Sequence, residues 1–255
     1  MAAGCVTTMQ CGGTVHKKAI APARRNVVEC AQNTWKIAWL LSGVPVVCAF
    51  RTRREHAIEK ADRNMAKLYF RYGVMGSSKT ANALMVRYNY EERGQRALMV
   101  KPAIDQRDGA RIVSSRIGLK HDCIYFSEFR TMPEEEIKAW QCIIVDEAQF
   151  LSRDDVWFIT DVVDRLGVPV ICYGLRADFR GDLFPGSEAL LAWADIVEEV
   201  KTICWCGKKA IFNARFDKNG VVLKEGEQVV LGANDCYIGL CRKHWKEGNL
   251  GPGRG

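Results

Sequence analysis

The stretch RYGVMGSSKT at residues 71–80 decides the fold, because it has the spacing of a loop that binds phosphate groups. Three points of the pattern G-x-x-x-x-G-K-[ST] are present, at Gly73, Lys79 and Thr80. The second glycine of the pattern is replaced by Ser78. A β-prone run precedes the loop and a helical pattern follows it, which is the context in which backbone N–H groups hold phosphate oxygens. The alternative is an ordinary turn between a strand and a helix.

Strands and helices alternate along the chain after residue 64. Apolar, β-prone runs predict strands at 67–72, 97–102, 123–126 and 168–174, and a further strand that begins at 142. Helical patterns lie at 77–93, 133–140 and about 153–166. In the first of these helices Ala81, Leu84, Met85 and Tyr88 share one face, and residues 104–122 predict a long loop or several short pieces. The alternation favours an α/β fold, a parallel sheet with helices on both faces.

The run CIIVDEAQF at 142–150 begins as a buried strand and ends in two acids. A strand of β-branched residues that delivers Asp146 to its carboxyl end is typical of sites where a carboxylate holds Mg²⁺ through water. Glu147 is adjacent and could take a proton from an attacking hydroxyl group. The alternative is a strand that ends in two solvated acids, which the upstream phosphate loop makes less favoured.

A third signal indicates a metal site near the C-terminus. Cys204 and Cys206 form a C-x-C pair, and after 34 intervening residues Cys241 and His244 form a C-x-x-H pair. Two such pairs can close a tetrahedral Cys₃His zinc site, and no nearby residue suggests an open coordination position, so we expect a structural zinc ion. The alternative is two buried thiols and two surface residues. After about Val200 the strand–helix alternation gives way to Cys, Gly and short β-prone runs, which indicates a second, smaller module.

Charge and cysteine usage exclude some classes of protein. Residues 1–64 contain ten basic and four acidic side chains and carry +6 of the net charge of +7. The remainder is nearly neutral, so charge gives no case for a polyanionic partner. Eleven cysteines, an odd number, spread along a chain of α/β pattern argue against a secreted disulfide framework and favour a reducing compartment.

The first 64 residues are predicted to be an N-terminal extension that is disordered or non-essential. Residues 37–50 are apolar, but they carry Gly43 and Pro45 and are too short for a usual transmembrane helix. A basic, acid-poor leader also fits an organelle transit peptide, which stays an open alternative.

The chain from Met65 to about Lys246 resembles the type II thymidine kinases, the cytosolic family of bacteria and animals, and is nearest to their bacterial branch. The segments that carry the resemblance are MAKLYFRYGVMGSSKT, SSRIGL, VDEAQFL, VICYGLRADFRGDLFPGS, LLAWAD, KTICWCG, EGEQVVLG and CRKHWKE. The resemblance implies a RecA-like P-loop kinase domain at 65–200 and a zinc-ribbon and lasso domain at 201–247. The remaining residues, 248–255, are predicted to be a flexible tail. It also implies a homotetramer in the cytoplasm, with neither nucleic acid nor membrane as a partner.

The same resemblance implies transfer of the ATP γ-phosphate to the 5′-hydroxyl of thymidine, a reaction of deoxynucleoside salvage for DNA synthesis, with dTTP as feedback inhibitor. Glu147 would be the general base and Asp146 a Mg²⁺ partner. The other residues implied for ATP and its metal are Gly73, Val74, Met75, Gly76, Ser77, Ser78, Lys79, Thr80, Asp105, Arg107 and Gln149. Those implied for thymidine are Phe150, Leu175, Phe179 and Phe184, and a lasso of Val230, Leu231, Gly232, Ala233 and Asn234 with Tyr237. The implied zinc ligands are Cys204, Cys206, Cys241 and His244.

Two positions depart from the family pattern. The family has glycine where this chain has Ser78, and if that residue adopts a positive φ, serine costs on the order of 1 kcal/mol. The lasso has Gly-Gly in the family and Gly232-Ala233 here. Two alternatives to the kinase remain: a DEAD-type P-loop ATPase that acts on nucleic acid, suggested by the DEAQ sequence, and a nucleotide-binding relative with weakened catalysis. The first needs two RecA-like domains, whereas this chain has room for one.

Overall fold

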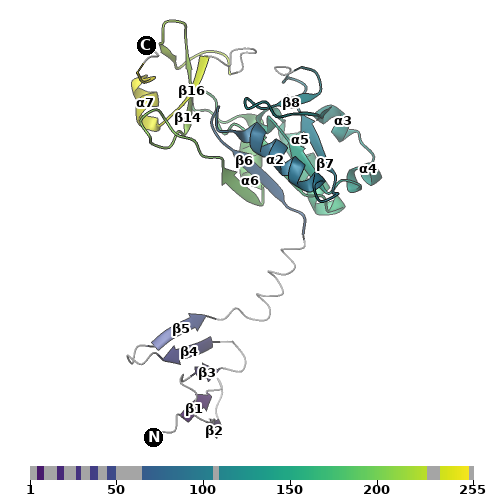
Figure 1. Ribbon diagram of the computed structural model, residues 1–255, viewed down its shortest axis with the longest axis vertical. Coiled ribbons are helices and arrows are strands. Elements are labelled where there is room, and N and C mark those ends of the chain that lie inside the picture. The colour runs from purple at the N-terminus through teal and green to yellow at the C-terminus, as the bar shows by residue number, and fades with distance from the viewer. Residues whose placement is uncertain are drawn as a thin grey trace. The chain divides into compact units, whose positions relative to one another are not determined.

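The computed structural model describes residues 65–105, 109–228 and 236–252, and five short strands within residues 1–64. Contacts divide the chain into two units, Met1–Met65 and Ala66–Gly255 (Figure 1). In the first unit, β1 (Cys5–Thr8) pairs with β2 (His16–Ala19), and β4 (Trp35–Trp39) lies between β3 (Val27–Glu29) and β5 (Pro45–Ala49), all antiparallel. That this unit is not needed for function stays a prediction. Within the described residues, no helix has the length and apolar character needed to cross a membrane.

A parallel sheet forms the centre of the second unit and confirms the predicted α/β class. In the described part of the chain its six strands lie in the order β10-β7-β11-β12-β6-β13. Their bounds are β6 (Leu68–Tyr72), β7 (Ala97–Lys101), β10 (Ile124–Tyr125), β11 (Cys142–Val145), β12 (Val170–Gly174) and β13 (Ile196–Glu199). The sequence patterns predict five of these strands and miss β13, an edge strand that pairs with β6.

Helices and a hairpin connect the strands. They are α2 (Lys79–Glu91), the antiparallel pair β8 (Ile112–Ser114) and β9 (Lys120–Asp122), α3 (Phe126–Arg130), α4 (Glu134–Lys138), the 3-10 turn η1 (Ala148–Phe150), α5 (Arg153–Leu166) and α6 (Pro185–Trp193). The described residues of the region 104–122 therefore form short pieces, of which β8 and β9 are two. On α2 the predicted face does not act as one buried surface, since Ala81 and Leu84 are buried while Met85 and Tyr88 are more than half exposed.

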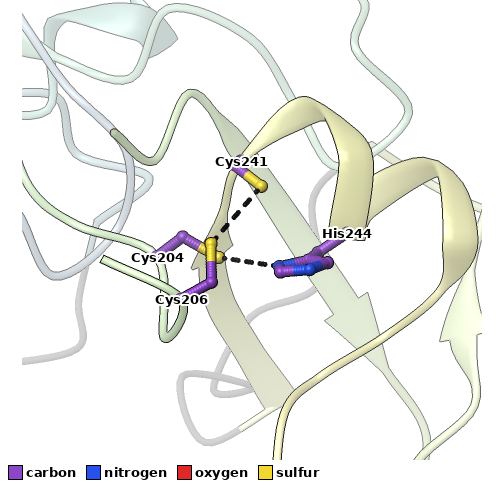
Figure 2. Close-up of side chains that lie close together, drawn as sticks. All are labelled: Cys204, Cys206, Cys241 and His244. Atoms are coloured by element: carbon purple, nitrogen blue, oxygen red, sulfur yellow. Dashed lines mark hydrogen bonds between the residues drawn. The ribbon is translucent and has the colours of Figure 1, made fainter. Parts of the chain in front are cut away.

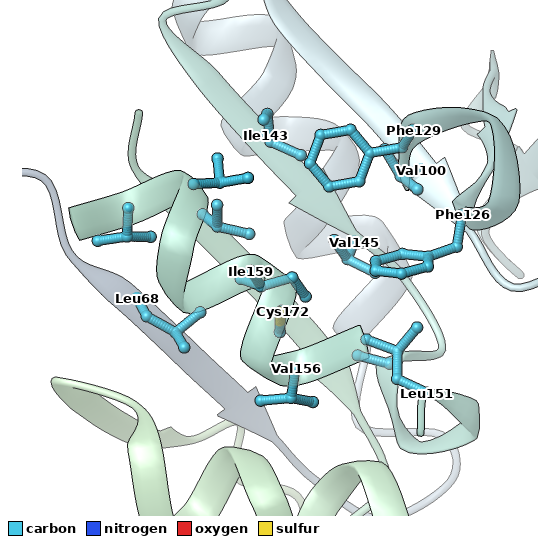
Figure 3. Packing of buried hydrophobic residues seen from close by; sticks show 14 of the residues in the cluster. Leu68, Val100, Phe126, Phe129, Ile143, Val145, Leu151, Val156, Ile159 and Cys172 are labelled. Carbon is cyan, nitrogen blue, oxygen red and sulfur yellow. The ribbon is translucent and has the colours of Figure 1, made fainter. Parts of the chain in front are cut away.

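The two faces of the sheet are covered by separate cores, because alternate residues of a strand point to opposite sides. On β11, Ile143 and Val145 belong to a core with α3, α4, α5 and α6 (Figure 3), whereas Cys142 and Ile144 belong to a core with α2. All four side chains are fully buried. A strand that is apolar on both faces is the expected form of a central parallel strand.

Residues 201–228 and 236–252 form what we call the ribbon module. Its strands β14 (Phe212–Phe216), β15 (Val222–Leu223) and β16 (Tyr237–Leu240) pair in the order β15-β14-β16 and are followed by α7 (Arg242–Glu247). Its core contains Cys204, Ala210, Ala214, Leu240, Cys241 and Leu250, together with Val74 of the phosphate loop. The predicted domain boundary after residue 200 stays a prediction, since contacts keep Ala66–Gly255 as one unit.

Candidate active site and metal centre

The loop between β6 and α2 turns tightly and brings Lys79 to the N-terminus of α2. A Cβ atom on Gly73 would lie 2.4 Å from the Ser77 Oγ and 2.6 Å from the Val200 carbonyl oxygen, so only glycine fits there. Gly76 has a φ of 77°, a conformation that glycine adopts without cost. Lys79 is buried at the start of α2 and donates from Nζ to the Val74 carbonyl at 2.9 Å. The loop thus surrounds the helix N-terminus with backbone groups and one ammonium group.

Ser78 adopts the left-handed conformation, with φ 61° and ψ 26°, as the N-cap of α2. Its side chain makes no capping hydrogen bond to the helix. Serine therefore occupies a position of positive φ, where its Cβ atom lowers the stability of the protein by on the order of 1 kcal/mol. The loop keeps its shape because the surrounding contacts outweigh that strain.

Asp146 follows β11 and lies buried beside the phosphate loop. The Thr80 hydroxyl and the Glu147 backbone N–H donate to its carboxylate. Burial, and then the negative charge of Glu147, raise the pKa of this carboxyl well above its usual range. A divalent cation between Asp146 and Thr80 would reverse that effect, because it stabilises the ionised form. This donor set of a carboxylate and a hydroxyl fits Mg²⁺.

Glu147 is half-buried and has a φ of 52°, which is rare for a residue that is not glycine. Gln149, which is 1% exposed, donates from Nε2 to the Glu147 carboxylate at 2.6 Å. The Gln149 Oε1 in turn accepts from the Leu175 N–H at 3.0 Å. The strained backbone and the buried amide together hold the carboxylate in one orientation, which is common at catalytic sites.

A cavity of about 400 Å³ brings most of the predicted nucleotide residues together. The predicted residues that line it are Met75, Gly76, Ser78, Lys79, Thr80, Asp105, Asp146, Glu147 and Leu175. Residues not assigned from the sequence also line it: Ala81, Val113, Ser114, Ser115, Arg116 and Ile117. Four of these lie in the segment SSRIGL, which carries the family resemblance. Arg107 lies outside the described residues.

The residues predicted for thymidine divide into three groups. Phe150 and Phe184 meet edge to face, with ring centroids 5.9 Å apart, near the end of the sheet where Leu175 lies. Phe179 is buried and lies under the Arg215 guanidinium, which is also hydrogen-bonded to Tyr237. The lasso residues Val230, Leu231, Gly232, Ala233 and Asn234 lie outside the described residues.

The four predicted metal ligands converge in the ribbon module (Figure 2). The donor atoms of Cys204, Cys206, Cys241 and His244 all lie within 4.8 Å of one another. The His244 Nδ1 is 3.4 Å from the Cys204 Sγ, and the Cys206 and Cys241 sulfurs are 3.9 Å apart. The backbone N–H of His244 contributes most to a lowered pKa of Cys241, which favours the thiolate that binds metal. Three thiols and an imidazole in this arrangement fit a tetrahedral zinc ion.

The aromatic ring of Trp205, which lies between two of the cysteines, stacks on the His244 ring at 4.2 Å. This contact fixes the plane of the imidazole, a role that neighbours of metal ligands commonly have.

A model of the thymidine kinase family matches residues 66–245 of this chain. The chain belongs to the thymidine kinase family. A thymidine kinase of Legionella pneumophila (strain Paris) is 47% identical over 193 residues, which cover 73% of this chain and 92% of that relative. A thymidine kinase of Haemophilus influenzae (strain ATCC 51907 / DSM 11121 / KW20 / Rd) is 50% identical over 188 residues, which cover 72% and 97%. This member of the thymidine kinase family thus contains nearly the whole length of those relatives.

Among solved structures, unliganded Pif1 from Bacteroides sp. is similar to this member of the thymidine kinase family. The similarity covers 60% of this chain and 42% of the Pif1 chain. The sequence identity is 12% and the TM-score is 0.36, too low to carry an argument about fold or activity.

Proposed function

We propose that this thymidine kinase transfers the γ-phosphoryl group of ATP to the 5′-hydroxyl of thymidine and so makes dTMP and ADP. The observation that carries the proposal is the cavity in which Lys79, Asp146 and Glu147 meet at the start of α2. Each charge matches a need of phosphoryl transfer: a cation for the phosphates, a carboxylate for Mg²⁺, and a second carboxylate for the hydroxyl proton.

In this reaction the 5′-oxygen attacks the γ-phosphorus while the bond from that phosphorus to the β–γ bridging oxygen breaks. The hydroxyl proton passes to the Glu147 carboxylate, and the leaving oxygen carries its charge away on ADP. Lys79 and the backbone N–H groups of the loop hold the phosphates and offset the charge that builds up on them. Gln149 keeps the Glu147 carboxylate pointed in one direction.

Two metals belong to the proposal. Asp146 and Thr80 would hold Mg²⁺, which supplies positive charge to the phosphates when bound. The Cys₃His cluster would hold a structural zinc ion, which stabilises the ribbon module without a part in the chemical step.

Base recognition is assigned to the aromatic residues and the lasso. The rings of Phe150 and Phe184 offer an apolar wall, and such a wall alone discriminates poorly between pyrimidines. Backbone groups of the lasso at 230–234 would bind the thymine edge and reject cytosine, because a mismatched polar group would be left unpaired.

The family further leads us to propose a homotetramer in the cytoplasm, inhibited by dTTP. We also propose that residues 1–64 are dispensable, because the family match begins at residue 66.

The test is production of dTMP from thymidine and Mg·ATP by the full chain and by a variant that begins at Met65, with deoxycytidine as the rejected nucleoside. Glu147→Gln removes the proton acceptor and keeps the size of the side chain. We expect its kcat to fall by about 10²- to 10⁴-fold. Glu136→Gln, on the exposed surface of α4, is the matched control and keeps full activity. Equal rates for wild type and Glu147→Gln would refute the role of the base.

A further inference from the structure

One buried side chain of the ribbon module contacts the phosphate loop directly. Asn213 lies on β14 and is 4% exposed. Its Oδ1 accepts from the Met75 backbone N–H at 2.7 Å, and its Nδ2 donates to the Ala177 carbonyl at 2.9 Å. Both ends of the amide are therefore used, and they join segments that lie 138 and 36 residues away along the chain.

The apolar side chain next to this hydrogen bond also points into the ribbon module. Val74 belongs to the module's core, together with Ala214 and Leu240. Across from it, a Cβ atom on Gly239 of β16 would lie 3.0 Å from the Val74 Cγ2, so the strand approaches the loop as closely as glycine permits. The first half of the phosphate loop thus packs against β14 and β16.

We propose that Asn213 is a positioning residue for ATP, which fixes the first half of the phosphate loop through the Met75 N–H. The inference deepens the proposed function and rests on it for its kinetic readout. A loop that binds phosphate through backbone groups depends on its exact conformation for affinity, because each displaced N–H group is lost to the ligand. Among the described residues, the Asn213–Met75 hydrogen bond and the packing of Val74 in the core of the ribbon module connect this part of the loop to elements outside the kinase sheet.

Loss of the Asn213 side chain should weaken the binding of ATP more than the binding of thymidine. The Ala177 end of the amide lies in a segment that has other anchors. Trp245 donates from Nε1 to the Phe179 carbonyl at 3.0 Å. The buried Asp178 carboxylate accepts from the backbone N–H groups of Arg180, Gly181 and Asp182. This segment therefore keeps its position when the Asn213 side chain is removed. The Met75 N–H, in contrast, loses its acceptor and faces the space that the removed side chain leaves.

The experiment uses the full chain and measures KM for ATP and for thymidine, kcat, and thermal unfolding. In Asn213→Ala we expect KM for ATP to rise about fivefold to tenfold, the effect of one lost hydrogen bond, with less than a twofold change for thymidine. Asn219→Ala is the matched control, because Asn219 is an exposed asparagine of the same module in the turn after β14. Its kinetic constants should equal those of wild type.

A purely structural role predicts a lower melting temperature with both KM values unchanged, and that result in Asn213→Ala overturns the proposal. If Asn213→Ala does not unfold cooperatively, Val74→Ala decides in its place, with the same expected rise in KM for ATP. A wild type that makes no dTMP refutes the proposed function, not this inference. Binding of a non-hydrolysable ATP analogue then gives the test, since wild type must bind it about fivefold to tenfold more tightly than the variant.

Discussion

The amide nitrogen of Gln149 lies 2.6 Å from a carboxylate oxygen of Glu147 and donates a hydrogen bond to it. The two residues are separated by one position in the chain, at the turn that follows β11. The oxygen of the same amide accepts a hydrogen bond from the Leu175 N–H. Gln149 therefore positions both the Glu147 carboxylate and the segment that follows β12. The proposed base is therefore oriented by a residue that does not line the cavity.

Replacing Gln149 with methionine keeps the volume and removes both hydrogen bonds. We expect kcat to fall about tenfold or more while KM for ATP changes little, because the phosphate loop is not touched. The Leu175 N–H is left unsatisfied, so the free energy of unfolding should fall by about 1–3 kcal/mol. Steady-state kinetics and thermal unfolding measure the two effects. Gln141→Met is the control, since the Gln141 amide also accepts from a backbone N–H but lies on the exposed surface.

Ser78→Gly relieves the left-handed backbone at the start of α2. The gain of about 1–2 kcal/mol is partly offset by the greater freedom of glycine in the unfolded chain, about 0.5–1 kcal/mol. We expect a melting temperature about 1–3 °C higher and a KM for ATP lowered about twofold. Ser127→Gly, in the exposed part of α3, should show the opposite sign, since glycine weakens an ordinary helix. A lower melting temperature for Ser78→Gly than for wild type would show that the left-handed backbone at Ser78 is not strained.

Asp146→Asn tests the cost of burying a carboxylate beside Glu147. The neutral amide avoids that cost, so the protein measured without nucleotide and Mg²⁺ should melt at least about 3 °C higher than wild type. The same variant should lose the added stability that Mg·ATP gives to wild type, and lose activity by about 100-fold. Differential scanning fluorimetry with and without Mg·ATP reports both signs. Asp164→Asn, on the exposed side of α5, should change neither value.

Cys241→Ser removes one donor of the metal cluster. Elemental analysis should find about one zinc ion per chain in wild type and much less in the variant, whose melting temperature should fall, because structural zinc contributes directly to folding. Cys236→Ser serves as control, since Cys236 is a free, half-buried cysteine outside the cluster. Full zinc content in Cys241→Ser would exclude this residue as a ligand.

Elements with local signals could be predicted from the sequence. The bounds of α5 follow from its own ends: Ser152 and Asp155 form a capping box, and Gly167 ends the helix in the left-handed conformation. The phosphate loop, the paired acids and the Cys₃His cluster are likewise short patterns whose chemistry requires those residue types at that spacing.

Features that depend on distant contacts could not be predicted. The strand β13 is half-exposed and short, and it exists because it pairs with β6, which lies 127 residues earlier. Asn213 belongs to no motif, and only the packing of β14 against the loop reveals its contact with Met75. On α2 the hydrophobic pattern was misleading, since small alanines face the sheet while Met85 and Tyr88 stay exposed.

The alternation of side chains on β11 also determines how the protein responds to the insertion or deletion of one residue near this strand. A shift of the whole strand by one residue relative to its neighbours would exchange its two sets of side chains between the faces of the sheet. Both sets are apolar and fully buried, so each core would receive side chains of acceptable chemistry. Asp146, however, would turn away from Thr80, and Glu147 would leave the cavity. Variants with one residue added or removed just before β11 that shift the strand in this way should therefore yield folded proteins without activity, and a screen for soluble expression would fail to detect the loss.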